Sequence, residues 1–114
     1  MKKISLVLMV ILGLAFAPGI AFAQMSLSGF RGECTSYDGE GGFGRTEVSC
    51  GPVQHHAICD TFADMLGQGH PDREACIQGC KDTWRSEQKY LIFSCPVVLR
   101  HSKELCELYC RRNY

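Results

Sequence analysis

The chain has 114 residues, eight of them cysteine, and its twelve basic side chains balance its twelve acidic ones. A chain of this length suits one small domain and not two. The even charge balance offers no basic surface for nucleic acid and argues against electrostatic capture by an anionic membrane.

The first 23 residues have the features of a cleaved secretory signal. Two lysines follow Met1, an apolar run covers residues 4–16, and Ala21-Phe22-Ala23 supplies the small-x-small pattern that a signal peptidase requires. The apolar run is shorter than the roughly 20 residues of a membrane-spanning helix. We therefore expect cleavage before Gln24 and a mature chain, residues 24–114, with net charge −2 and no transmembrane segment.

Residues 24–51 form an arm that is rich in glycine, serine and threonine, with residues 39–44 at its centre. The flanks 33–37 and 45–49 have the composition of short antiparallel strands, so we expect irregular structure with at most one hairpin. A phosphate-binding loop would need Gly-Lys-Ser/Thr between a strand and a helix, and that setting is missing.

The first predicted helix begins at Pro52, because proline suits the first turn of a helix. Apolar residues then recur at helical spacing, namely Ile58, Phe62, Met65 and Leu66. The segment Gly67-Gln68-Gly69 ends this helix. This helix is the first element of residues 52–114, which we expect to form a helical, disulfide-rich domain.

The second and third predicted helices follow a turn at His70-Pro71. The second runs to about Tyr90, and its buried stripe is predicted to contain Cys76, Ile77, Cys80 and Trp84. The third starts near Ser94 or Pro96, and its inner face is predicted to contain Leu99, Ser102, Cys106, Tyr109 and Cys110. The predicted fold class is therefore mainly α, a small three-helix domain with an irregular or hairpin-containing arm.

All eight cysteines lie in the mature chain, and so dense an even set in an exported chain predicts a disulfide framework. Two C-x-x-x-C motifs each place two sulfurs one turn apart on one helix face. In an antiparallel helix pair, residues at equal height have position numbers with a constant sum. Cys76 with Cys110 gives the same sum as Cys80 with Cys106, so these two bridges are predicted to form together.

The paired motifs resemble the alpha-hairpinin peptides, in which two antiparallel helices are stapled by two C-x-x-x-C motifs. The resemblance covers residues 76–110 and implies a helical hairpin. The spacer, residues 81–105, is longer than in those peptides, and four further cysteines have no counterpart in them. The resemblance therefore implies no activity for this chain.

The other four cysteines leave two pairings open. If the first helix is antiparallel to the second, Cys50 lies at the same end of the domain as Cys95. Cys59 is then offset from Cys95 by on the order of 15 Å along the helix axis, beyond the roughly 7 Å reach of a disulfide. This favours Cys50–Cys95 with Cys34–Cys59. The alternative, Cys34–Cys50 with Cys59–Cys95, requires a tilted or shorter first helix.

No residue set predicts a catalytic, cofactor or metal site. Cys59 follows His55 by four residues, and Asp60 follows His56 by four, a spacing that suits a metal pair or a base with its partner. Neither pair has a third convergent group, so we expect both histidines on the surface. Reduced C-x-x-x-C motifs would predict a thiolate site for copper or zinc, which is one alternative function. No catalytic motif occurs, so we expect no enzyme; a small secreted hydrolase with an unrecognised site is the other alternative.

An apolar cluster flanks the hinge between the second and third helices and is the predicted interaction patch: Leu91, Ile92, Phe93, Val97 and Val98. Either a partner docks there or the Gly-rich arm covers it. The sequence thus predicts a non-enzymatic binding or structural module, periplasmic or secreted, whose partner would be another envelope or extracellular protein.

Overall fold

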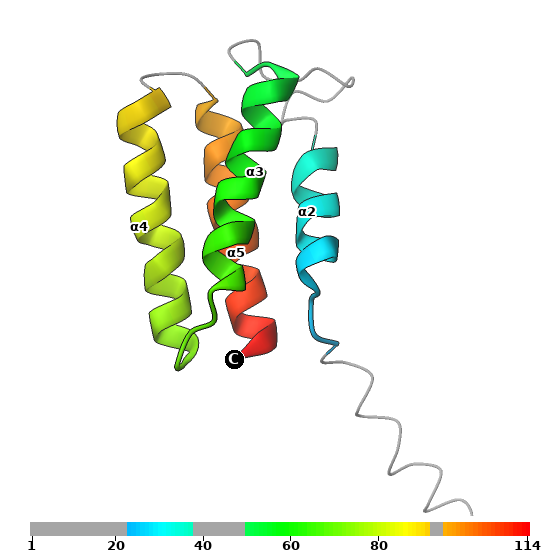
Figure 1. Cartoon of the computed structure of the whole chain (residues 1–114), viewed down its shortest axis with the longest axis vertical. Helices are drawn as coiled ribbons and strands as arrows, with labels where there is room; N and C mark the ends of the chain where they lie inside the picture. The colour runs from blue at the N-terminus through cyan, green and yellow to red at the C-terminus, as the bar shows by residue number, and fades with distance from the viewer. Residues whose placement is uncertain (1–22, 38–49, 92–94) are drawn as a thin grey trace, which may run out of the picture.

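The structure, a computed structural model, describes residues 23–37, 50–91 and 95–114. Within these residues the chain forms four helices and no strand (Figure 1): α2 (Leu27–Ser36), α3 (Pro52–Gly67), α4 (Arg73–Leu91) and α5 (Pro96–Asn113). Successive helices run in opposite directions along the bundle. The predicted fold class, a mainly helical domain stapled by disulfides, is confirmed.

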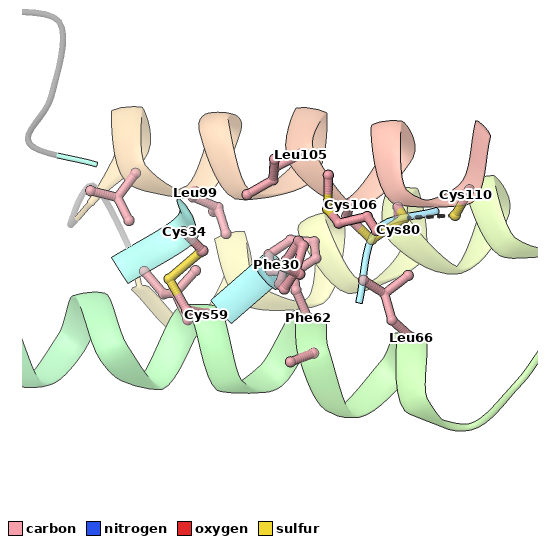
Figure 2. Packing of buried hydrophobic residues seen from close by; sticks show 14 of the residues in the cluster. Phe30, Cys34, Cys59, Phe62, Leu66, Cys80, Leu99, Leu105, Cys106 and Cys110 are labelled. Carbon is pink, nitrogen blue, oxygen red and sulfur yellow. Dashed lines mark hydrogen bonds between the residues drawn. A yellow bond between two sulfur atoms is a disulfide. The ribbon is translucent and has the colours of Figure 1, made fainter. Parts of the chain in front are cut away.

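Helices α3 and α5 form the centre of the bundle, because each of them contacts all three other described helices. Helices α2 and α4 flank this central pair and do not pack against each other in the described part of the chain (Figure 1). Apart from the cysteines, the core contains Phe30, Ile58, Phe62, Leu66, Val98, Leu99 and Leu105. Figure 2 shows the packing around Phe30 and Phe62. Each flanking helix therefore depends on the central pair for its burial.

The three helices predicted in residues 52–114 are present, and local signals set their ends. Pro52 and Pro96 occupy the first turns of α3 and α5. The Oδ1 atom of Asp72 accepts a hydrogen bond from the N–H of Ala75 at 2.8 Å and so caps α4. Between α3 and α4 the chain turns at Gly69, whose φ of 76° favours glycine.

The arm predicted to be irregular contains a helix, α2. Residues 33–37, proposed as one strand of a hairpin, instead form its last turn and C-cap; residues 45–49, the other proposed strand, lie outside the described residues. The helix begins after Ser26, whose Oγ accepts a backbone hydrogen bond of 3.0 Å. Two glycines in ten residues lower its intrinsic helix propensity, so its stability comes from burying Phe30 and Cys34 one turn apart.

The four disulfides follow the favoured pairing: Cys34–Cys59, Cys50–Cys95, Cys76–Cys110 and Cys80–Cys106. Two of them join α4 to α5, one joins α2 to α3, and one joins the chain just before α3 to the residue just before α5. The alternative pairing is wrong: Cys59, inside α3, lies with its Cα 5.8 Å from that of Cys34 in α2 and is bridged to it. The bridges link all four helices into one covalent network.

Candidate functional site

The cysteines offer no thiolate ligand, because all eight are oxidised and buried. The Sγ atoms of Cys80 and Cys110, which belong to different bridges, lie 3.6 Å apart, so the two bridges between α4 and α5 form one compact sulfur cluster. Among the described residues, no three histidine, cysteine or acidic side chains are grouped to hold a metal ion. A thiolate metal site would require the opening of buried bridges.

His55 lies on the buried side of α3 and holds the end of α2. Its side chain is 6% exposed, and its Nε2 lies 2.7 Å from the backbone oxygen of Cys34. A carbonyl oxygen only accepts, so Nε2 carries the proton and donates it. The last four carbonyl groups of a helix have no partner within it, and α2 has no basic side chain in its last turn. His55 therefore caps α2 from a neighbouring helix, while its predicted partner Cys59 is bridged to Cys34.

His101 contacts the same end of α2 from α5. Its ring stacks on Tyr37, with the ring centroids 3.7 Å apart and the planes inclined by 8°. Burial lowers the pKa of His101 from its ordinary 6.5, and the charge of His55 adds to this shift. The carboxylates of Glu104 and Glu33 oppose it. The neutral ring is therefore the favoured form in the stack.

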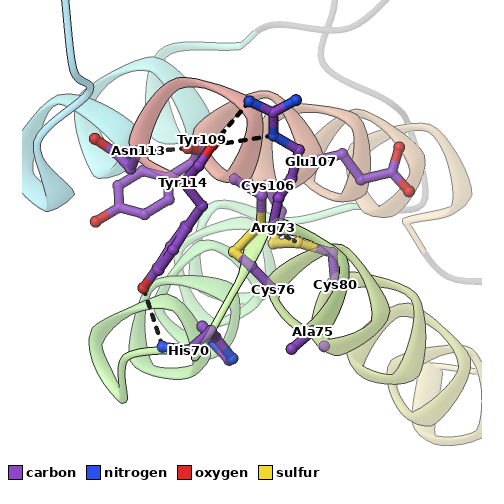
Figure 3. The surroundings of a disulfide bond; sticks show 12 residues. His70, Arg73, Ala75, Cys76, Cys80, Cys106, Glu107, Tyr109, Asn113 and Tyr114 are labelled. Carbon is purple, nitrogen blue, oxygen red and sulfur yellow. Dashed lines mark hydrogen bonds between the residues drawn. A yellow bond between two sulfur atoms is a disulfide. The ribbon is translucent and has the colours of Figure 1, made fainter.

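At the opposite end of the bundle, His70 and Arg73 hold Tyr114 (Figure 3). The backbone N–H of His70 donates to the Tyr114 hydroxyl at 3.0 Å, and the Arg73 guanidinium donates to the backbone oxygen of Tyr114 at 2.8 Å. The Nε2 of His70 also lies 3.1 Å from the backbone oxygen of Met65. These contacts hold the turn between α3 and α4 next to the C-terminal end of α5. His70 therefore has a structural role.

The outward face of α3 carries a shallow, open hollow, lined by Pro52, Val53, His56, Ala57 and Asp60. Its lining is mostly apolar, and Val53 is 83% exposed. Arg31 of α2 contacts the carboxylate of Asp60 at 3.0 Å. The positive charge of Arg31 opposes the binding of a metal cation by the predicted pair of His56 and Asp60. The guanidinium also pairs with the Asp60 carboxylate, which His56 would need as its partner if it acted as a base.

The predicted interaction patch is described only in part. The side chains of residues 91–93 lie outside the described part of the structure, so their role stays a prediction. Val98 is 2% exposed and belongs to the core, whereas Val97 is half-buried. Tyr90, next to the patch, is 81% exposed, and Val53 at the start of α3 lies at the same end of the bundle (Figure 1). Exposed apolar side chains therefore do occur at this end.

Sequence reasoning missed the hollow on α3. Val53 and Ala57 are four residues apart, which places them on one helix face, opposite the core residues Ile58 and Phe62. The helical periodicity of this segment could therefore have shown that two apolar residues face outward. The contact of Arg31 with Asp60 joins two helices and has no such signal in the sequence.

Function has to be argued from the chain's own residues. None of the described helices is both long and apolar enough to span a membrane. Comparison of the chain with protein-family models, with curated proteins and with solved structures finds no match.

Proposed function

We propose that the chain is an exported, non-enzymatic binding or structural module that acts in an oxidising compartment, the bacterial periplasm or the exterior. The observation that carries this proposal is the pairing of all eight cysteines in buried disulfides that link the four helices. Disulfides persist in exported proteins and are rare in the reducing cytosol. The signal-like residues 1–23 support the same destination.

The size of the domain explains why it needs these cross-links. A chain this short buries a modest apolar core, which by itself gives marginal stability. The bridges close loops of 25 to 45 residues, and the chain-entropy model assigns about 3.5 to 4 kcal/mol to each such loop when it is counted alone. The disulfides therefore supply the stability that a small helical scaffold needs in order to present a surface outside the cell.

The contacts of the histidines support a non-enzymatic role. His55 caps α2, His101 stacks on Tyr37, and His70 holds the turn between α3 and α4. His56 lies in the open hollow, where Arg31 already engages the neighbouring carboxylate. A general base needs a ring that faces substrate and a partner that orients it, whereas the rings of His55, His70 and His101 are used to hold parts of the fold together.

We place the contact surface at the end of the bundle where α3 and α5 begin and α4 ends. The exposed side chains of Val53 and Tyr90 and the hollow on α3 support this placement. The predicted apolar residues 91–93 would enlarge the surface. An apolar side chain of another envelope or extracellular protein is the chemistry that fits it.

The test of export and oxidation is a count of free thiols in the protein made from the full chain in a bacterium. We expect the protein in the periplasm or medium, with no adduct after alkylation without reductant and eight adducts after reduction. The same chain without residues 2–23, kept in the cytosol, is the matched control and should react before reduction. Four or more adducts in the exported protein, or a cytosolic product that retains residues 1–23, would overturn the proposal.

The test of the contact surface is photo-crosslinking in intact cells. A photoreactive amino acid at position 53 should give a discrete cross-linked product, and the same amino acid at position 78, exposed on α4, is the matched control. Equal cross-linking from both positions would show that this end of the bundle is not a preferred contact.

A further inference from the structure

The packed part of the mature chain begins one residue after the predicted cleavage site. Met25 is 8% exposed, and its backbone oxygen accepts a hydrogen bond of 3.0 Å from Nδ2 of Asn113 near the end of α5. Ser26 then caps α2. Ala23 and Gln24, on either side of the predicted cleavage bond, are exposed. The structure thus places this bond between two exposed residues, directly before the first packed residue, Met25.

We propose that Gln24 becomes the N-terminal residue of the mature protein and closes to pyroglutamate. This inference rests on the proposed export, because only cleavage after Ala23 gives Gln24 a free α-amine. In the reaction the α-amine attacks Cδ of the Gln24 side chain and forms a new C–N bond. The bond from Cδ to Nε2 breaks, and the nitrogen leaves as ammonia. No oxidant, reductant or co-reactant takes part.

The position of Gln24 favours this closure. Its exposed side chain is free to turn back on its own amine, while the chain that follows is anchored at Met25. The reactive form of the amine is the neutral one, and an α-amino group with an ordinary pKa of about 7.7 to 8 is partly neutral at physiological pH. The five-membered ring therefore forms without disturbing the packed residues.

Ring closure also removes a charge from an unfavourable place. Before closure, the ammonium group of Gln24 lies three residues before Leu27, the first residue of α2. The N-terminus of a helix carries a partial positive charge, and the first turn of α2 has no acidic side chain to offset another one. The lactam is neutral, so it fits this helix end better. It also leaves no free amine for an aminopeptidase, which protects Met25 and the start of α2.

The experiment is mass spectrometry of the N-terminal peptide of the exported protein, with Gln24→Ala as the matched control. We expect the wild-type peptide to begin at residue 24, to be lighter than the glutamine form by one ammonia, and to resist stepwise degradation from the N-terminus. The control variant should be cleaved at the same bond, keep its full mass and release alanine in the first cycle.

Two other results separate this inference from the export on which it rests. Cleavage before residue 24 with an unmodified glutamine, after storage at neutral pH, would overturn the ring closure and leave the export intact. Cleavage at another bond, or none, would overturn the inference together with the proposed cleavage site.

Discussion

The two flanking helices are attached to the central pair by different means. Helix α4 is joined to α5 by two disulfides one helical turn apart. Helix α2 has one disulfide, and its other attachments are noncovalent. These include the hydrogen bond from His55 to the Cys34 carbonyl and the stack of Tyr37 on His101. Because α4 is held by two bridges and α2 by one, the loss of one bridge should matter more on the α2 side.

The largest predicted effect is the loss of the bridge that holds α2. The double variant Cys34→Ala/Cys59→Ala should lower the free energy of unfolding by about 3.5 kcal/mol, because the bridge closes a loop of 25 residues. The measurement is the urea midpoint, together with hydrogen exchange of the amides in residues 27–36. These amides should exchange faster than those of α4, because α2 is the less stable unit.

The matched control for that variant is Cys80→Ala/Cys106→Ala, whose bridge closes a loop of similar length, 26 residues. Its neighbour Cys76–Cys110 remains and still ties α4 to α5. The cost should therefore be smaller, and the exchange of α4 amides should change little. An equal or larger loss of stability in this control would contradict the idea that redundancy protects the α4 side.

The second predicted effect concerns the cap on α2. The substitution His55→Phe keeps an aromatic ring in the buried position but removes the donor, which leaves the Cys34 carbonyl without this partner. An unsatisfied buried carbonyl costs about 1 to 3 kcal/mol. The urea midpoint should fall accordingly, and His55→Gln, which keeps an N–H donor, should recover part of the loss. If the two variants are equally stable, the hydrogen bond does not contribute to holding α2.

The same contrast explains which parts of the fold are predictable from sequence. The α4–α5 pair is predictable because the spacing of its four cysteines reflects antiparallel helices directly. The rise per residue of a helix likewise favours Cys50 over Cys59 as the partner of Cys95, although it leaves the other pairing open, and the structure decides between them. Helix α2 is not predictable in this way, because its glycines argue against a helix and its stability depends on Phe30, Cys34 and partners distant in the sequence.

The candidate site shows the same limit. The spacing of His56 and Asp60 is visible in the sequence, but the arrival of Arg31 from another helix, which changes what that pair can do, is not. His55 lies three residues before Ile58 and is buried, which corrects the surface position expected for it, and its acceptor on α2 depends on a helix that the glycine content hides. Local spacing therefore predicts which face a residue occupies, and tertiary packing decides its partner.

The third predicted effect is a loss of stability at acid pH through His101. Its pKa is lowered from 6.5 in the folded protein, mainly by burial, so the unfolded chain takes up the proton first as the pH falls. Stability should be unaffected by this group well above pH 6.5 and should decline as the pH falls through that value. His101→Phe keeps a ring to stack on Tyr37 but cannot titrate, so the pH dependence of its urea midpoint should be flatter.

The carboxylates of Glu33 and Glu104 and the ring of His55 also face His101, so the wild-type curve alone does not isolate its effect. The difference between the wild-type and His101→Phe curves does. That difference should grow as the pH falls below 6.5. A constant difference across this range would mean that His101 is protonated equally in the folded and unfolded chains.

The smallest predicted effect is on the charged surface of α2. Arg31 contacts Asp60 at 3.0 Å and Asp64 at 3.3 Å, but all three side chains are about half exposed or more. Exposed ion pairs contribute about 0.2 to 1 kcal/mol each and are screened by salt. Arg31→Ala should therefore lower the urea midpoint less than His55→Phe does, and the difference from wild type should shrink at high salt. A larger loss that salt does not reduce would mean that α2 is held chiefly by Arg31 and not by its buried contacts.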